Sequence, residues 1–281
     1  MGNRRMGRRR LDSLLERNYD SNDEWGFVRP PMVPGLQRNL RVIAIGQMHG
    51  FGMEDLTDVP VDGQTTSVWL RDDENSAPAP TLVANNADFK DGAFKITTGG
   101  AAADQTAILT AAEPFQCVTG KKWWVEASFK VDDIDTTEMF FGLVEASYTE
   151  GENLAVKAAA GGADSAGFCK NVHTTGAIKI RQNKDTDATN DIDISLDTAI
   201  TLAADTDVLT LAIHWDGNGN IKYYGGRAAT GSEVGALNLV KTVSASVPDQ
   251  TMALVLQVAE AAGATAAESL TINYIRGAWE I

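Results

Sequence analysis

A series of short β-type segments, rich in β-branched and aromatic residues, constrains the fold more than any other feature of this sequence. Turn residues separate these segments, and no long leucine-rich helical pattern interrupts them. In Trp124–Val131, Glu126 and Lys130 fall on one face, as the two-residue period of a half-buried strand requires. In Asp191–Asp197 polar and apolar residues alternate strictly. Strands at this spacing, without helices between them, are typical of a β-sandwich or jelly roll.

The same pattern places the individual elements. Asp216–Asn220 predicts a hairpin turn, because Gly and Asn tolerate positive φ. Helix is expected at Glu233–Leu239, and Ala259–Glu268 fits a helix or a loop. The expected strands are Leu40–Ile45, Gln64–Leu70, Ala93–Thr97, Thr106–Thr110, Lys122–Val131, Met139–Ala146, Ala177–Arg181, Ile192–Leu196, Val208–Trp215, Asn220–Tyr224, Met252–Val258 and Ser269–Ile275.

Composition shifts divide the 281 residues into three expected regions. Residues 1–60 form a basic, proline-rich extended arm, because three prolines within Pro30–Pro34 favour an extended and semi-rigid path. Residues 61–80 form a connector with a possible strand, which ends at the proline pair Pro78 and Pro80. Residues 81–281 form the β-sandwich, and this length is sufficient to bury a sizeable core.

The arm and the rest of the chain differ in the sign of their charge. Residues 1–41 hold nine arginines and five acids, a net charge of 9 − 5 = +4, so the remaining 240 residues carry −14 − 4 = −18. Such an acidic body does not attract nucleic acid through its own field, which leaves the arm as the segment able to contact it. Guanidinium groups bind carboxylates and carbonyls well. The arginines expected to bind a partner are Arg4, Arg5, Arg8, Arg9 and Arg10.

Aromatic residues of the arm suggest a packing surface. Trp25 and Phe27 lie in a turn-rich stretch that offers no local core. They pack either against the chain's own body or against a neighbouring subunit, and the sequence leaves both alternatives open.

Motifs of catalysis and metal binding are not recognisable in the sequence. His49, His173 and His214 do not stand at ligand spacing, and His214 is expected to be structural. Acidic clusters such as Asp132–Asp135 and Asp216–Asn220 suit calcium, but turns select the same residues, so we expect no metal. Nucleophile motifs and phosphate-binding glycine loops are also lacking. The chain is therefore expected to be neither an enzyme nor a cofactor-binding protein.

Two further expectations concern the compartment. Cys117 and Cys169 do not make a disulfide framework, and two reduced thiols are expected, with a single bridge as the alternative. The apolar runs Leu11–Glu16 and Leu40–Ile45 are too short for a signal peptide core or a membrane span. We therefore expect a soluble protein that is made in the cytoplasm.

Adjacent aromatic pairs give the candidate ligand contacts. Trp123–Trp124 and Tyr223–Tyr224 must divide between the two faces of a sheet, because successive side chains point to opposite sides. One aromatic of each pair is then core, and the other faces outward toward a glycan or another subunit. Trp215 and Tyr224 are the residues expected to contact a glycan.

Several of these segments resemble concanavalin-like, laminin-G-like jelly-roll sandwiches. The resemblance covers residues 80–281, and it is closest to structural proteins of tailed bacteriophages; Met1–Leu11 is similar to the start of marine phage virion proteins. Plant lectins of this fold carry a calcium and manganese carboxylate cluster that has no recognisable counterpart here. The segments concerned are Lys122–Val131, Phe140–Leu143, Ala166–Phe168, Leu209–Tyr224 and Ile272–Trp279.

The resemblance implies a virion structural protein without enzymatic activity, namely a capsid decoration or cement protein on the capsid surface. The arm would then bind major capsid protein subunits, and the protein would be a homo-oligomer, with a trimer expected by analogy. The alternative is a lectin-like, glycan-binding adhesion module on the virion or tail fibre, with host polysaccharide as its partner. A membrane partner is not expected.

Overall fold

The computed structural model describes an all-β chain. Its described residues are 40–46, 69–73, 77–83, 89, 93–101, 104–145, 153–155, 163–171, 176–184, 194–195, 200–228, 237–261 and 266–280. Within these ranges no helix is long and apolar enough to cross a membrane. The arm arginines, Trp25 and Phe27 lie outside the described residues.

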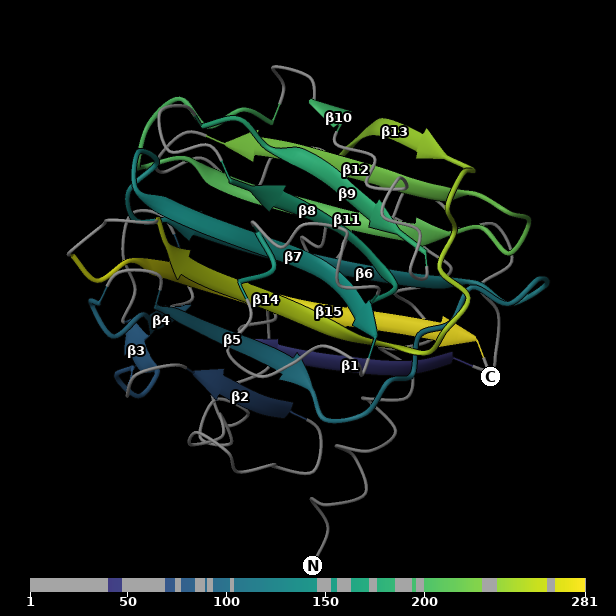
Figure 1. Ribbon diagram of the computed structural model, residues 1–281, viewed down its shortest axis with the longest axis horizontal. Helices are drawn as coiled ribbons and strands as arrows, with labels where there is room; N and C mark the ends of the chain where they lie inside the picture. The colour runs from purple at the N-terminus through teal and green to yellow at the C-terminus, as the bar shows by residue number, and fades with distance from the viewer. Residues whose placement is uncertain are drawn as a thin grey trace, which may run out of the picture.

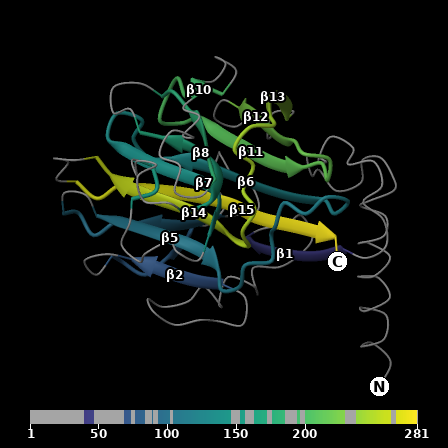
Figure 2. The same cartoon turned by 45° about the vertical axis from the view of Figure 1, so that its right-hand side comes forward.

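The strands form two antiparallel sheets that stack as the layers of a sandwich (Figures 1 and 2). These sheets confirm the predicted jelly-roll β-sandwich. The eight-stranded sheet, here called sheet A, has the order β13 (Asn238–Val243), β12 (Ile221–Ala228), β11 (Val208–Trp215), β6 (Trp123–Val131), β15 (Ser269–Glu280), β4 (Ala93–Thr97) and β3 (Thr81–Val83), with β1 (Leu40–Gly46) paired to β15. The seven-stranded sheet B has the order β10 (Ile194–Ser195), β9 (Lys179–Asn183), β8 (Ser165–Lys170), β7 (Thr137–Glu145), β14 (Met252–Glu260), β5 (Gln105–Thr110) and β2 (Trp69–Asp73).

The core lies between the sheets, where apolar side chains from alternate positions of each strand meet. On β6, Val125, Ala127 and Phe129 point into it, as the two-residue period predicts. Phe168 of sheet B meets Tyr223 of sheet A edge to face, with ring centroids 5.4 Å apart. This single buried cluster fixes which face of each strand is left to contact solvent or a ligand.

The predicted hairpin joins β11 to β12. Gly217 and Gly219 adopt φ values of 76° and 97°, which a glycine reaches without steric cost. The Asp216 carboxylate accepts hydrogen bonds from the backbone N–H groups of Asn218 (2.8 Å) and Asn220 (3.2 Å). Partial burial opposes a charged Asp216, but its pKa is lowered, because the Asn220 side-chain amide (2.9 Å), these backbone hydrogen bonds and Lys222 stabilise the carboxylate. The acidic loop thus binds its own backbone.

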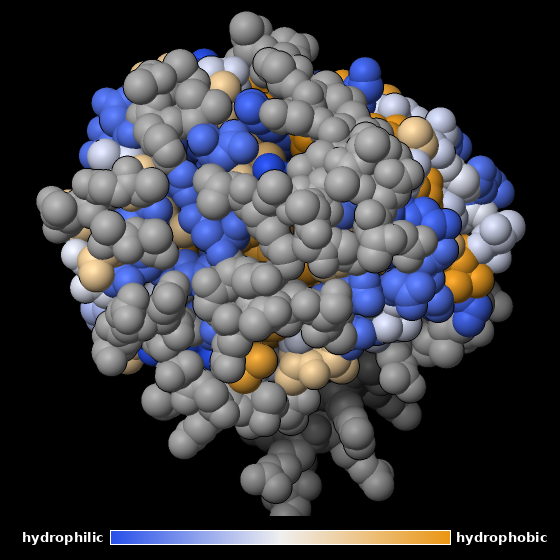
Figure 3. Space-filling model, in the orientation of Figure 1, coloured by the Kyte–Doolittle hydropathy of each residue, from blue (hydrophilic) through white to orange (hydrophobic). Residues whose placement is uncertain are grey.

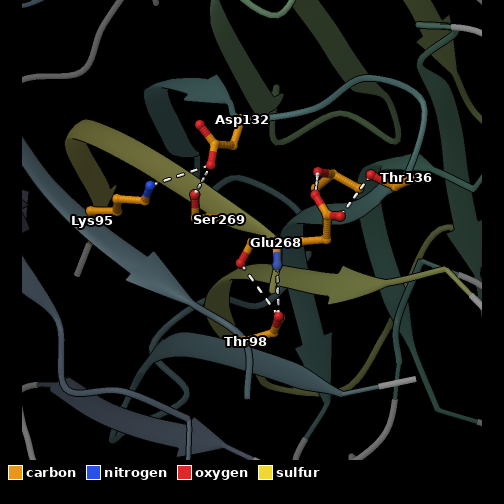
Figure 4. Close-up of polar contacts among 7 residues, drawn as sticks. Lys95, Thr98, Asp132, Thr136, Glu268 and Ser269 are labelled. Atoms are coloured by element: carbon orange, nitrogen blue, oxygen red, sulfur yellow. Dashed lines mark hydrogen bonds and ion pairs between the residues drawn. The ribbon is translucent and has the colours of Figure 1, made fainter. Parts of the chain in front are cut away.

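A polar network, buried at Glu268 and Thr137 and exposed at Asp132, ties together turns at one end of the sandwich (Figure 4). The Glu268 carboxylate accepts hydrogen bonds from the hydroxyls of Thr136 and Thr137, each at 2.6 Å. The Glu268 backbone N–H donates to the Thr98 hydroxyl at 2.9 Å. Ser269 donates to Asp132 at 2.8 Å. The network joins the turns after β4 and β6 to the start of β15.

A short segment, residues 153–155, crosses the outer face of sheet B. The Leu154 backbone N–H donates to Gln257 Oε1 (2.7 Å), and its carbonyl accepts from Arg181 (2.6 Å). The Leu154 side chain covers a second apolar cluster that includes Phe140 and Val255. The described atoms on the face shown in Figure 3 are mostly hydrophilic, with scattered apolar ones.

The structure corrects two sequence-based expectations. The division at residue 81 is wrong, because β1 and β2 belong to the two sheets; β1 pairs with β15 from Leu40 opposite Glu280 to Gly46 opposite Tyr274. Long-range pairing of this kind has no local sequence signal. The helix expected at Glu233–Leu239 is wrong at its end, since Asn238 begins strand β13.

Candidate functional site on the outer face of sheet A

The outer face of sheet A brings together side chains from four neighbouring strands. The register places Glu126 of β6 between Arg276 of β15 and Ala212 of β11. One row further along, Trp124 lies opposite His214. On β12, Tyr224 pairs with Ala212. Glu126 and Arg276, which are 150 positions apart in sequence, therefore share one patch.

Glu126 is the centre of the polar part of this patch. Its carboxylate is fully buried and accepts three hydrogen bonds: from Trp124 Nε1 at 3.0 Å, Tyr274 Oη at 2.5 Å and Arg276 Nη2 at 2.9 Å. The Arg276 guanidinium also lies 5.0 Å from the centroid of the Tyr274 ring. Burial, and then the Glu126 charge, raise the pKa of the Tyr274 hydroxyl, so it remains a donor at neutral pH.

Three rings form the apolar part of the patch. Trp124 lies 5.4 Å from Tyr224 and 6.0 Å from His214 between ring centroids, and both pairs are tilted. Trp124 and Tyr224 form an apolar cluster with Ala212, separate from the main core. All three rings are buried, with exposures of 3%, 7% and 4% for Trp124, Tyr224 and His214.

His214 contributes a buried nitrogen that has no hydrogen-bond partner. Its Nε2 atom is buried, and no described residue bonds to it. Burial, and then the nearby Lys222 charge, lower the pKa of His214 to about 4, so the ring is neutral at physiological pH. An unsatisfied buried polar group costs about 1–3 kcal/mol, so this nitrogen calls for an explanation.

The patch combines the chemical elements of a small-molecule site. Aromatic rings provide apolar area, the Glu126–Arg276 ion pair provides directional donors and acceptors, and the neutral imidazole of His214 has a buried nitrogen without a partner among the described residues. A group with a perturbed pKa beside such rings is a candidate binding residue. The arrangement suits a neutral hydroxyl-bearing ligand group at His214 and polar groups near Arg276.

The structure separates the two residues expected to contact a glycan. Tyr224 does face outward and belongs to the patch. Trp215 is wrong as a contact, because it points into the core and donates from Nε1 to the carbonyl of Val118 at 3.1 Å. The predicted division of the aromatic pairs is confirmed: Trp123 and Tyr223 are in the core, and Trp124 and Tyr224 face outward.

Sequence reasoning missed the polar half of the site. Glu126 was placed on the same face of its strand as Lys130, but its partners Tyr274 and Arg276 come from a strand about 150 residues later. His214 was expected to be structural because it stands alone in the sequence. Alternation along β11 places His214 and Trp215 on opposite faces, but only the tertiary structure shows that His214 is the one on the outer face.

Other candidate groups do not form a site in the described part of the chain. Groups of three or more His, Cys, Asp or Glu suited to a metal ion do not occur among the described residues. Cys117 and Cys169 are both free thiols. Burial raises the pKa of the Cys117 thiol to about 12, which keeps it protonated and unreactive.

Comparisons with known proteins support the fold. No protein-family model matches the sequence, and no curated protein does. A protein of unknown function from Shewanella oneidensis MR-1 superposes with a TM-score of 0.56 and 12% identity, covering 88% of this chain and 90% of its own. An endo-1,3-β-glucanase from Streptomyces sioyaensis superposes with a TM-score of 0.50 and 12% identity, covering 88% and 99%. The carbohydrate recognition domain of Emp47p gives a TM-score of 0.46 and 8% identity, covering 76% and 89%.

Proposed function

We propose that this chain is a carbohydrate-binding module and that the outer face of sheet A is its binding surface. The observation that carries the proposal is the Nε2 atom of His214, which is buried among aromatic rings and has no hydrogen-bond partner among the described residues. A sugar hydroxyl can donate to or accept from a neutral imidazole. Because a jelly-roll fold by itself does not assign a function, the proposal depends on this site and not on the fold.

Binding without hydrolysis fits the chemistry of the patch. Glycoside hydrolysis uses two carboxyl groups that flank the scissile bond, one of which must hold or accept a proton. Within the described part of the patch, Glu126 is the carboxylate among the rings, and it is held by three donors, including Arg276. Both oxygens of this carboxylate are engaged by neighbouring donors, which leaves neither oriented toward a scissile bond.

His214→Phe tests the role of the imidazole. The substitution keeps a flat ring but removes both nitrogens, so we expect binding of the best glycan from an array to weaken roughly tenfold, the loss of about one hydrogen bond. The melting temperature should stay the same or rise, because the unsatisfied nitrogen is gone. Isothermal titration calorimetry and thermal unfolding measure the two effects.

Val118→Ala changes an exposed residue in the loop before β6 whose side chain is not part of the patch, so this matched control should bind as the unchanged chain does. If the His214→Phe variant binds the glycan as tightly as the unchanged chain does, the proposed site is refuted. Release of new reducing ends from the bound glycan would show instead that the protein is a hydrolase.

A second candidate function rests on the charge of residues 1–41, which carry +4 on a chain of net charge −14. We propose that this arm anchors the protein to an acidic surface, such as capsid subunits of a bacteriophage virion or a sister copy, with the sandwich as a decoration on the particle. The two functions are compatible, because the arginines of residues 1–20 and the residues of the patch are different residues of the chain.

Deletion of residues 1–20 tests the anchor. Five of the nine arginines of the arm stand in the first ten residues. We therefore expect the truncated chain to lose co-sedimentation with particles while its glycan affinity is unchanged. Full occupancy of particles by the truncated chain would remove the arm from the anchoring role.

A further inference from the structure

The core between the two sheets ends in polar side chains at one end of the sandwich. Alternate residues of β14 point into the core, and Glu260, the last residue of this strand, continues their two-residue period. On β4 the same period leads through Phe94 and Ile96 to Thr98. Glu260 and Thr98 are both fully buried. A carboxyl group therefore occupies a position where the strand pattern calls for an apolar side chain.

This carboxyl group joins sheet B to sheet A. Glu260 Oε1 accepts hydrogen bonds from the Thr98 hydroxyl and from the Gly100 backbone N–H, the latter at 3.0 Å. The Thr98 hydroxyl also accepts from the Glu268 backbone N–H at 2.9 Å, which connects Glu260 to the network of Figure 4. Because Thr98 and Gly100 follow β4 of sheet A and Glu260 ends β14 of sheet B, the contact holds the two layers together.

The second oxygen of the same carboxyl group is not stabilised in this way. Glu260 Oε2 is buried and accepts no hydrogen bond from the described residues. Burial without hydrogen bonds is much more unfavourable for an ionised carboxylate than for a neutral acid. The surroundings of Oε2 therefore favour the protonated form of Glu260.

The charges that act directly on Glu260 are negative. They belong to Asp104 and Glu268. Asp104 is held close to Glu260, because its carbonyl accepts a hydrogen bond from the Glu260 backbone N–H at 2.9 Å. The segments that adjoin these acids in the sequence, residues 101–103 and 261–267, contain no charged residue. Two further carboxylates thus oppose the ionisation of Glu260.

Lys170 of β8 is a buried cation at this end of the core, but other groups share its charge. Its Nζ atom donates to the carbonyl of Thr137 at 2.8 Å. The carboxylates whose charge acts on Lys170 are Glu138, Asp135, Asp133 and Glu268. Burial lowers the pKa of Lys170, and these carboxylates oppose that change.

The same contacts determine how the proton on Glu260 is linked to folding. Burial raises the pKa of the Glu260 carboxyl group, and the charges of Asp104 and Glu268 raise it further, although the hydrogen bonds from Thr98 and Gly100 lower it. Because this pKa is higher in the folded protein than in the unfolded chain, the folded protein binds the proton more tightly. Ionised Glu260 therefore destabilises the fold at neutral pH, and this loss disappears as the pH falls to the ordinary value of 4.5.

We propose that Glu260 is an acid-operated clasp between the two sheets. In acidic surroundings the carboxyl group takes up a proton, keeps its contacts with Thr98 and Gly100, and makes this end of the sandwich more stable. In neutral surroundings the proton leaves and the clasp is weakened. The clasp does not require a ligand, because Glu260 lies between the sheets and the candidate binding patch lies on the outer face of sheet A.

Glu260→Gln in the full-length chain tests the clasp, because the amide has the shape of the protonated acid and carries no charge. We expect this variant to melt about 2–4 °C higher than the unchanged chain at pH 8. The difference between the two melting temperatures should fall by at least half at pH 4.5, where the unchanged chain carries the proton as well. Glu260→Met, which extends the apolar period of β14, is a second uncharged variant and should show the same change with pH.

Asp249→Asn is the matched control. A hydrogen bond from Lys184 lowers the pKa of Asp249, so ionisation of this group stabilises the fold, and the control should melt no higher than the unchanged chain at pH 8. A melting difference for both Glu260 variants that is the same at pH 8 and pH 4.5 overturns the clasp, whatever its sign. A purely structural effect of the substitutions would give that result, because it does not depend on the proton.

Discussion

Gly142→Ala should destabilise the protein by about 3 kcal/mol, the upper end of what overpacking costs. Gly142 lies on β7 opposite Gly167 of β8, in the middle of sheet B. A Cβ atom at position 142 would lie 2.4 Å from the carbonyl oxygen of Ala166 and 2.5 Å from the Cα of Gly167. Both atoms are backbone, so the two strands would have to separate. Chemical denaturation followed by circular dichroism measures the loss.

Gly120→Ala is the control for this prediction. Gly120 has a φ of 84°, and a Cβ atom there would have nothing within 4 Å. Its substitution therefore adds only backbone strain, about 1–2 kcal/mol. If Gly142→Ala lowers the free energy of unfolding no more than Gly120→Ala does, the close approach of β7 and β8 is not what requires a glycine at position 142.

Arg276→Met should also cost about 3 kcal/mol, because it leaves the buried Glu126 carboxylate without its cationic partner. Trp124 and Tyr274 would still donate to Glu126, but neither neutralises its charge. The measurement is urea unfolding of the single variants, Arg276→Met and Glu126→Gln, and of the double variant. We expect the free energy of unfolding lost in the double variant to be about 1–3 kcal/mol smaller than the sum of the two single losses, because the two residues are in direct contact.

Lys95→Met provides the matched comparison. It breaks an ion pair with Asp132 whose two side chains are 33% and 50% exposed, and surface pairs are worth about 0–1 kcal/mol. The pair Glu126–Arg276 does not hold the patch together if the losses in free energy of unfolding for Glu126→Gln and Arg276→Met simply add. The same conclusion follows if Arg276→Met costs no more than Lys95→Met.

Local pattern predicted most of the strands of this protein. Val208–Trp215 and Ala93–Thr97 are strands with the expected bounds. The short strand β3 and the edge strand β13 were missed, because three residues give no period and because β13 is largely exposed on both faces. Strand β8 was recognised only through resemblance, since its small residues Ser165, Ala166 and Gly167 have low intrinsic preference for strands.

Half of the candidate site was also predictable. The adjacent aromatics Trp123 and Trp124 had to face opposite ways, and the structure confirms that they do. Trp215 does not belong to such a pair, and the sequence did not show whether Trp215 or its neighbour His214 faces the core. The choice depends on which face of β11 meets sheet B, and that contact is made by residues far away in the sequence.

The all-β character, the position of most strands and the hairpin at Asp216–Asn220 follow from local sequence, because they depend on side-chain period and local φ preference. The pairing of β15 with β6, and with it the contact of Arg276 and Tyr274 with Glu126, is visible only in the folded chain. Strand order has no local signature, since it follows from the burial of one shared core by all the strands together. For that reason the candidate binding face emerges from the fold and not from any motif.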